Sequence, residues 1–325
     1  MRRLVAWVGL VCIGLGVAAV RPSYGEDLGD PGSPAEPVIE AEAAEAGPAA
    51  DMLELARRVS AGERHNLKVS ADYRIWREDA ESLNEMRLRF GAGMALEIET
   101  VDPEGNAQGR LILHSLAMKA TGPLEAGLDY DSTDPFAPAT IENLLLGSLV
   151  GLNYQFRLDP SGRMIEMKGL DDSLRKAEAL MPGSELKRSF LNQVKDRLDY
   201  EKLMGVAGDP HLYPGTPVAV GDVWTGSAES ILNGMLLVTE DRFQLVDRKN
   251  GLALVEYQSV IGSRGTSETA GFSGAQRGWI EIEEATGWVA GFRIEQELTS
   301  SLGDPETDAA LLRMQGVTTM GPFEN

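Results

Sequence analysis

The chain has 325 residues, of which 43% are hydrophobic, and its 30 Lys and Arg against 50 Asp and Glu give a formal net charge of −20. A chain this acidic repels nucleic-acid phosphates and anionic lipid surfaces, and no basic run offsets that repulsion. We therefore expect no nucleic-acid binding. Cys12 is the only cysteine, so an internal disulfide is excluded and a thiolate metal site is not expected.

Residues 1–25 have the pattern of a secretory signal peptide. Arg2 and Arg3 precede an apolar run over residues 4–20, and Ser23-Tyr24-Gly25 supplies a small-x-small cleavage signal. We predict cleavage near Gly25 and a periplasmic or extracellular location. The alternative is an N-terminal membrane anchor, although this run is shorter than the ~20 residues that a spanning helix needs.

The next two regions differ sharply in composition. Residues 26–51 carry eight acids, no bases and four prolines, which predicts a disordered acidic tether rich in Pro and Ala, because such a segment buries too little apolar surface to fold. Residues 52–325 are predicted to form a single β-rich domain. The proline-rich segment 209–217, interpreted as a surface loop, marks a possible subdivision of that domain.

Apolar and polar residues alternate over long stretches of this domain, which predicts strands with one face in solvent and hence an antiparallel sheet. The stretches are 67–75, 86–98, 235–247, 252–261, 288–298 and 311–320. In the fifth of them Trp288 and Ala290 are expected on the apolar face and Val289 on the opposite one. Four segments that begin with an acid and end with glycine (102–105, 159–162, 247–251 and 284–287) predict type I hairpin turns.

Helical periodicity is confined to the middle of the chain, at 139–150, 171–181 and 184–204, and each segment has a single apolar stripe. In the first of them the stripe consists of Ile141, Leu144, Leu145 and Leu149. We therefore predict a β-dominated α+β fold: a long curved antiparallel sheet or open half-barrel, partly covered by two or three mid-chain helices.

No motif predicts catalysis, a metal site or a cofactor. Ser173–Lys176 and Ser184–Lys187 match S-x-x-K but lack its partner motifs. The acids of 129–134 do not meet the calcium-loop pattern. The three histidines are scattered along the chain, and histidine in acid–base or metal sites needs partners. We therefore expect a protein that is not an enzyme.

Aromatic residues are concentrated in the predicted strands. If the sheet curls, they could line an apolar pocket for a greasy ligand. The alternative is that they pack beneath the helices, which is the commoner role of such residues. The candidate ligand-binding residues are Tyr73, Phe90, Tyr154, Phe156, Trp224 and Phe292.

Three segments, 154–162, 218–224 and 278–287, together resemble an uncharacterised family of exported bacterial proteins, a domain of unknown function. The shared motifs are a D-x-x-G hairpin, a V-x-V-G-D-x-W strand start and an acid-x-x-T-G turn. The resemblance spans roughly 60–320 and implies no activity. Glu283 and Glu284 stand where an aspartate is usual before the T-G turn. More distantly, the expected architecture is similar to the open half-barrels of lipoprotein carriers.

Taken together, the sequence predicts an exported, non-enzymatic protein that binds an apolar small molecule in the concavity of a curved sheet. The alternative is a structural or protein-interaction module of the cell envelope, with an envelope protein as its partner. In either case the mature chain is expected to have no membrane span.

Overall fold

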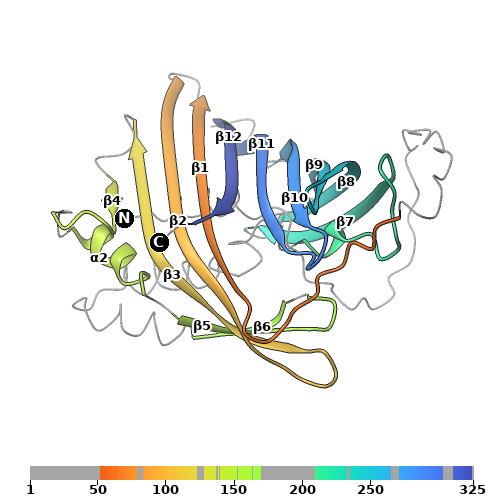
Figure 1. The fold of residues 1–325 in the computed structure, drawn as a ribbon. Coiled ribbons are helices and arrows are strands. Elements are labelled where there is room, and N and C mark those ends of the chain that lie inside the picture. Colours follow the sequence, from red (N-terminus) through yellow and green to blue (C-terminus); the bar gives the residue numbers. More distant parts are fainter. Residues whose placement is uncertain are drawn as a thin grey trace, which may run out of the picture.

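The computed structural model describes residues 52–78, 83–122, 128–136, 138, 140–151, 153–162, 164–169, 209–232, 235–264, 271–302 and 310–323. Within these ranges nearly all regular structure is antiparallel β-strand, and all strands join one twelve-stranded sheet (Figure 1). The β-dominated part of the predicted fold is therefore confirmed. No helix among these residues is long and apolar enough to cross a membrane.

Strands β1 to β3 and β7 to β12 follow each other as hairpins, and the first and last strands meet in the middle of the sheet. The order across the sheet is β6-β5-β3-β2-β1-β12-β11-β10-β9-β8-β7, with β4 added beside β3. Their bounds are β1 Arg64–Glu78, β2 Leu83–Val101, β3 Ala107–Thr121, β4 Asp129–Asp131, β5 Asn153–Leu158, β6 Met164–Lys168, β7 Val223–Leu232, β8 Met235–Lys249, β9 Leu252–Arg264, β10 Phe272–Glu283, β11 Val289–Leu302 and β12 Ala310–Pro322.

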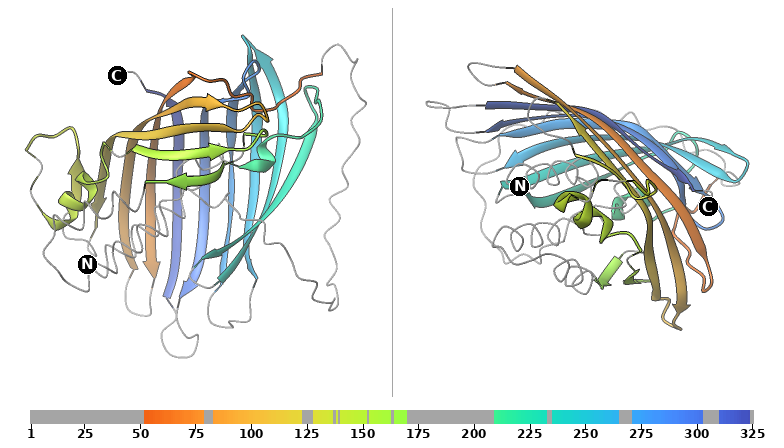
Figure 2. Two further views of the ribbon diagram at one scale, coloured as in Figure 1. Left: turned by 90° about the horizontal axis from the view of Figure 1, so that it is seen from below. Right: turned by 90° about the vertical axis from the view of Figure 1, so that its left-hand side faces the viewer.

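The sheet is strongly curved, and Figure 2 shows it bending round one side. The alternation in sequence explains which side that is. In β1 the buried positions are Leu67, Val69, Ala71, Tyr73 and Ile75, and the residues between them are more exposed. We call the buried side the core face and the opposite side the outer face. Because the core face is continuous from β5 to β7, the molecule has one extended apolar core.

The four predicted turns all connect neighbouring strands, but one has a different type. At the β8–β9 turn Asn250 and Gly251 both have positive φ, 55° and 78°, which is the type I′ geometry of a two-residue hairpin. At the β10–β11 hairpin a register shift brings Val289 opposite Ile282. This bulge turns the Val289 side chain into the core, so the prediction that Val289 lies on the outer face was wrong.

Two short helices are described. α2 (Ile141–Gly147) is capped by the Thr140 side chain, which accepts from the backbone N–H of Asn143. It is shorter than the predicted 139–150, and Leu144 is exposed although the apolar stripe was expected to bury it. The 3-10 helix η3 comprises Pro210–Leu212. The helices predicted over 171–181 and 184–204 lie outside the described residues.

Two segments close one end of the sheet. Residues 52–63 run beneath it: Leu53 pairs with Val218, and the backbone N–H of Arg58 donates to Thr286. The buried guanidinium of Arg57 lies over the Trp288 ring, 4.9 Å from its centroid. In the segment 209–217 Leu212 is fully buried. That segment is therefore partly a core element, not the surface loop that its prolines suggested.

Gly316 of β12 offers a test of the packing on the core face. A Cβ there would clash with Cδ1 of Tyr73, which is fully buried and whose hydroxyl lies 2.6 Å from Oγ1 of Thr318. We expect Gly316→Ala to lower the free energy of unfolding by about 1–3 kcal/mol, as overpacking does. Urea denaturation measures the change. The control is Gly321→Ala in the same strand, where a Cβ meets no atom within 4 Å, and an equal effect of both variants would contradict the prediction.

Candidate functional site

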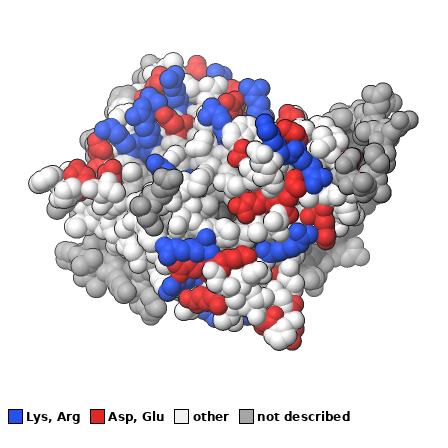
Figure 3. All heavy atoms as spheres, in the orientation of Figure 1, with Lys and Arg blue, Asp and Glu red and all other residues white. Residues whose placement is uncertain are grey.

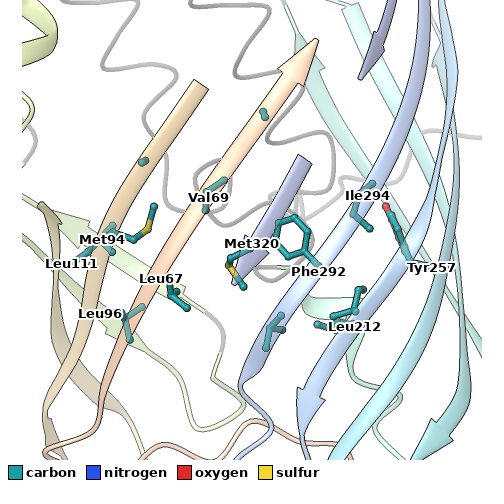
Figure 4. Close-up of a cluster of buried hydrophobic side chains, with 14 of the residues drawn as sticks. Leu67, Val69, Met94, Leu96, Leu111, Leu212, Tyr257, Phe292, Ile294 and Met320 are labelled. Carbon is teal, nitrogen blue, oxygen red and sulfur yellow. The ribbon is translucent and has the colours of Figure 1, made fainter. Parts of the chain in front are cut away.

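The six aromatic residues predicted to bind a ligand all lie on the core face, but they do not form one cluster. Tyr154 and Phe156 belong to β5 near one edge of the sheet, whereas Trp224 belongs to β7 at the other edge. Tyr73, Phe90 and Phe292 lie between them. Figure 4 shows Phe292 of β11 beside Met320 of β12 on the core face, with Ile294 farther along β11 and Val69 on β1. Their predicted role in ligand binding stays a prediction.

Trp224 introduces a second group of aromatic residues at the β7 edge. Its ring stacks on Phe243 at a centroid distance of 5.7 Å, and Phe243 in turn contacts Tyr257 at 5.3 Å. The indole N–H of Trp224 donates to the backbone carbonyl of His211 at 3.1 Å. Trp224 thus fixes the position of η3 against the sheet.

Beside this aromatic group, a row of polar side chains crosses the apolar core face. Asp241 of β8 pairs with Ser259 of β9, Ser259 with Gln276 of β10, and Gln276 with Gln296 of β11. All four residues are at most 7% exposed. We call these four residues, together with the Tyr257 hydroxyl that contacts them, the polar row. A row of this kind is costly to bury and therefore calls for an explanation.

Direct hydrogen bonds link most members of the polar row. The Tyr257 hydroxyl lies 3.0 Å from Oδ1 of Asp241 and 3.1 Å from Oε1 of Gln276. The Gln276 side-chain amide donates to Oε1 of Gln296 at 3.1 Å. The single Tyr257 proton can serve only one of its two acceptors. If Asp241 is protonated and donates to Tyr257, the Tyr257 proton becomes available to Gln276.

Several atoms in and beside the polar row are buried without a hydrogen-bond partner among the described residues. Within the row they are Oδ2 of Asp241, Oγ of Ser259 and Nε2 of Gln296, and in η3 and its cap they are Oδ2 of Asp209 and Nδ1 of His211. Asp209 is 1% exposed, and its Oδ1 accepts from the backbone N–H of His211 at 2.7 Å. The polar row therefore contains hydrogen-bond acceptors and one donor that have no partner among the described residues.

Burial sets the electrostatics of this region. Burial, with the nearby Asp209 charge, raises the pKa of Asp241 to about 6. The pKa of His211 is raised by the carboxylate of Asp209, whose Oδ1 lies 3.3 Å from Nδ1 of His211 in ion-pair range but off the hydrogen-bond direction. Burial and the Asp241 charge raise the pKa of Tyr257 well above its ordinary value, so this hydroxyl stays protonated.

The chemistry of the polar row fits hydrogen bonding better than metal binding. Among the described residues, no three His, Cys, Asp or Glu side chains gather in an arrangement that could hold a metal ion. Asp129 of β4 instead pairs with Lys119. Asp131 and Asp134 hold turns, in which Oδ1 of Asp131 accepts from the backbone N–H of Thr133 at 2.8 Å. His65 lies apart from the row, with its ring 4.2 Å from that of Trp288.

The polar row was missed by sequence reasoning, although the sequence contains a signal for it. Asp241 falls in the same alternation phase as the buried Leu237, Phe243 and Leu245. Gln276 and Gln296 likewise fall in the inward phase of their strands. A polar residue in an inward phase marks a buried polar group. That the four residues meet in one row depends on the register of the strands, which the sequence alone does not give.

Residues 105–289, more than half of the chain, match the model of a family of unknown function, DUF6263. This chain is a member of that family. The expectation of an uncharacterised family is therefore confirmed, and three of the four strands that carry the polar row lie inside the match. No curated protein matches the sequence.

Similarity to solved structures is weak. Lipovitellin, from a structure described as showing lipid–protein interactions, has a TM-score of 0.44 at 10% identity, covering 82% of this chain and 25% of its own. This chain thus spans about a quarter of lipovitellin. DynF of Micromonospora chersina has a TM-score of 0.22 at 8% identity, with 90% and 94% covered. OpdQ of Pseudomonas aeruginosa has 0.24 at 7%, with 81% and 100% covered. None of these scores establishes a shared fold.

The raised pKa of Asp241 predicts a pH-dependent stability. Because the folded-state pKa of about 6 lies above the ordinary 3.8, the folded state binds this proton more tightly than the unfolded chain does. The contribution of Asp241 is therefore fully favourable below pH ~3.8 and is lost as the pH rises through about 6. We expect Asp241→Asn to be more stable than the wild type at pH 7.5, by about 1–3 kcal/mol, and nearly equal to it at pH 4.

Denaturant unfolding of both proteins at the two pH values measures this difference. Glu240→Gln, a neutralisation at the exposed neighbouring position of β8, is the control and should show no comparable pH dependence. A stability gain that is the same at pH 4 and pH 7.5 would show that Asp241 is already neutral, or that it is paired by groups outside the described residues.

Proposed function

We propose that this protein is an exported, non-enzymatic binding protein that holds an amphipathic ligand on its core face. The polar row is the observation that carries the proposal. Each buried polar atom without a partner costs about 1–3 kcal/mol, and apolar side chains at the same positions would avoid that cost. A ligand whose head group has both donors and acceptors would pair with Oδ2 of Asp241 and with Nε2 of Gln296.

The apolar part of the ligand has a matching surface next to the polar row. Tyr73 of β1 lies opposite Gly316 of β12, and Gly316 lies opposite Gln296. The row therefore runs directly into the apolar centre of the sheet, where Phe292, Ile294 and Met320 lie on the core face (Figure 4). A mostly apolar lining with a few converging polar groups is typical of small-molecule binding sites.

The connection between β6 and β7 supplies the proposed cover of this surface. β6 lies at one edge of the sheet and β7 at the other, so the chain between Lys168 and Val223 must pass from edge to edge. The helices predicted over 171–181 and 184–204 fall in this connection, and their single apolar stripes suit the core face. We infer that they cover the bound ligand.

Binding is favoured over catalysis by the state of the groups in the polar row. No histidine or lysine lies in the polar row, so Ser259 lacks the usual base of a serine nucleophile there. Tyr257 stays protonated because its pKa is raised. Export is supported by the signal-like residues 1–25.

The test is to express the precursor in a bacterial host, purify the processed protein, extract it with organic solvent and identify bound amphiphiles by mass spectrometry. We expect a stoichiometric amphiphile in the wild type. We expect several-fold less in Gln296→Leu, which replaces a member of the polar row by an apolar side chain and removes the acceptor of the Gln276 amide.

The matched control is Gln258→Leu, which makes the same change at an exposed position of β9 and should keep the ligand. Absence of any bound amphiphile from the wild type would contradict the proposal. A Gln296→Leu variant that unfolds more easily and carries as much ligand as the wild type would show that the polar row serves packing alone.

A further inference from the structure

The outer face of the sheet carries a depression of about 980 Å³ over the five central strands β2, β1, β12, β11 and β10. Outer-face residues form most of its lining, and Gln276 and Gln296 of the polar row also border it, whereas the proposed ligand lies on the core face. Its floor is formed by small or uncharged side chains, among them Ser70, Val317 and Thr319. Its two walls are formed by charged side chains. We call this depression the arginine trough.

The wall over β1 and β2 is basic. Arg74, Arg87 and Arg89 line it, with Asp72 as the acid among them. Asp72 forms two hydrogen bonds with Arg87, at 2.8 and 2.5 Å, and lies 3.5 Å from Arg89. Figure 3 shows basic side chains gathered over these strands. The wall therefore has a surplus of two positive charges in a chain whose net charge is −20.

Arg74 is the least compensated of these groups. It lies directly opposite Arg87 in the β1–β2 register, and like charges in such pairs are destabilising. It makes no ion pair with any residue of the described ranges, whereas Arg87 is held by Asp72. The wall over β10 and β11 is balanced, because Glu295 and Glu297 match Arg277 and Arg293 in number. Glu295 lies 3.5 Å from Arg277 and 3.3 Å from Arg293.

We propose that the acidic segment 26–51 of the same chain docks into the arginine trough against the basic wall. The segment has eight acids and no base, and it directly precedes the first described residue, Met52. A free polyanion would be repelled by the net charge of the molecule. In the tethered segment this repulsion is offset, because the tether holds the segment at a millimolar effective concentration near the trough.

The length of the segment permits this contact. Twenty-six extended residues span up to roughly 85 Å. A domain of about 270 residues has a radius of gyration of only about 19 Å. The segment therefore reaches any point on the outer face, and its place there is chosen by charge. The docked segment would shield a sheet surface that is otherwise open to partners.

Cysteine crosslinking tests the proposal cleanly because Cys12 is the only native thiol. The full precursor is expressed with Cys12→Ser, so that an engineered pair holds the only thiols whether or not the leader is removed. One cysteine replaces Ala35, which keeps all eight acids, and the other replaces Val317 on the trough floor. The control pair combines Ala35→Cys with Glu104→Cys, an exposed position in the β2–β3 turn.

With a short bismaleimide at low ionic strength, we expect the Ala35–Val317 pair to crosslink within the chain about tenfold faster than the control pair. The advantage should disappear in 0.5 M NaCl, which screens contacts between exposed charges. It should also disappear in Arg74→Glu and persist in Lys249→Glu, which makes the same charge change at the far β8–β9 turn.

Equal rates for the two pairs would overturn the proposal, and so would an advantage that is insensitive to salt and to Arg74→Glu. An advantage lost equally in Arg74→Glu and Lys249→Glu would also overturn it, because the segment would then respond to net charge alone. Circular dichroism of each variant verifies that it is folded. Ligand extraction is not involved, so this result is independent of the outcome of the amphiphile test.

Discussion

The structure depends on one constraint: a broad sheet with one apolar face has to keep that face from water. Alternation along strands such as β1 and β2 places large apolar side chains on one side over the whole width of the sheet. Curvature turns this side inward, and the bulge at Val289 and the clamp of Arg57 against Trp288 close its end. Because burial of this surface drives folding, each polar side chain on it opposes folding.

The polar row has to be understood against that background. Its members occupy positions where apolar residues would stabilise the protein, and the raised pKa of Asp241 shows what burial costs that carboxyl group. Proteins often accept such costs at binding sites, where pre-placed polar groups recognise a ligand. The two faces of the same strands thus differ in chemistry. The core face is apolar apart from the polar row, and the outer face carries the arginine trough.

Much of the fold could be predicted from alternation, and the limits of that prediction have physical causes. The phase of Leu67, Val69 and Tyr73 gives the buried face of β1 directly, because side chains in a strand have a period of two. The bulge at Val289 could not be predicted. One extra residue shifts the in–out alternation of β11, and no residue in the sequence indicates where that happens. The polar row could be predicted residue by residue, from Asp241 in an inward phase, but not as a row. Register comes from long-range pairing between strands that are far apart in the chain.

The pairing of β1 with β12 has a consequence for how this protein is made. These two strands, separated by almost the whole chain, form twelve residue pairs in the middle of the sheet. The two halves of the sheet therefore remain unjoined until the last residues have been synthesised and, in an exported chain, delivered. Such long sequence separation between contacting residues slows folding. Loss of β12 would split the sheet at its centre, whereas a circular permutation joining the native ends would shorten this late step.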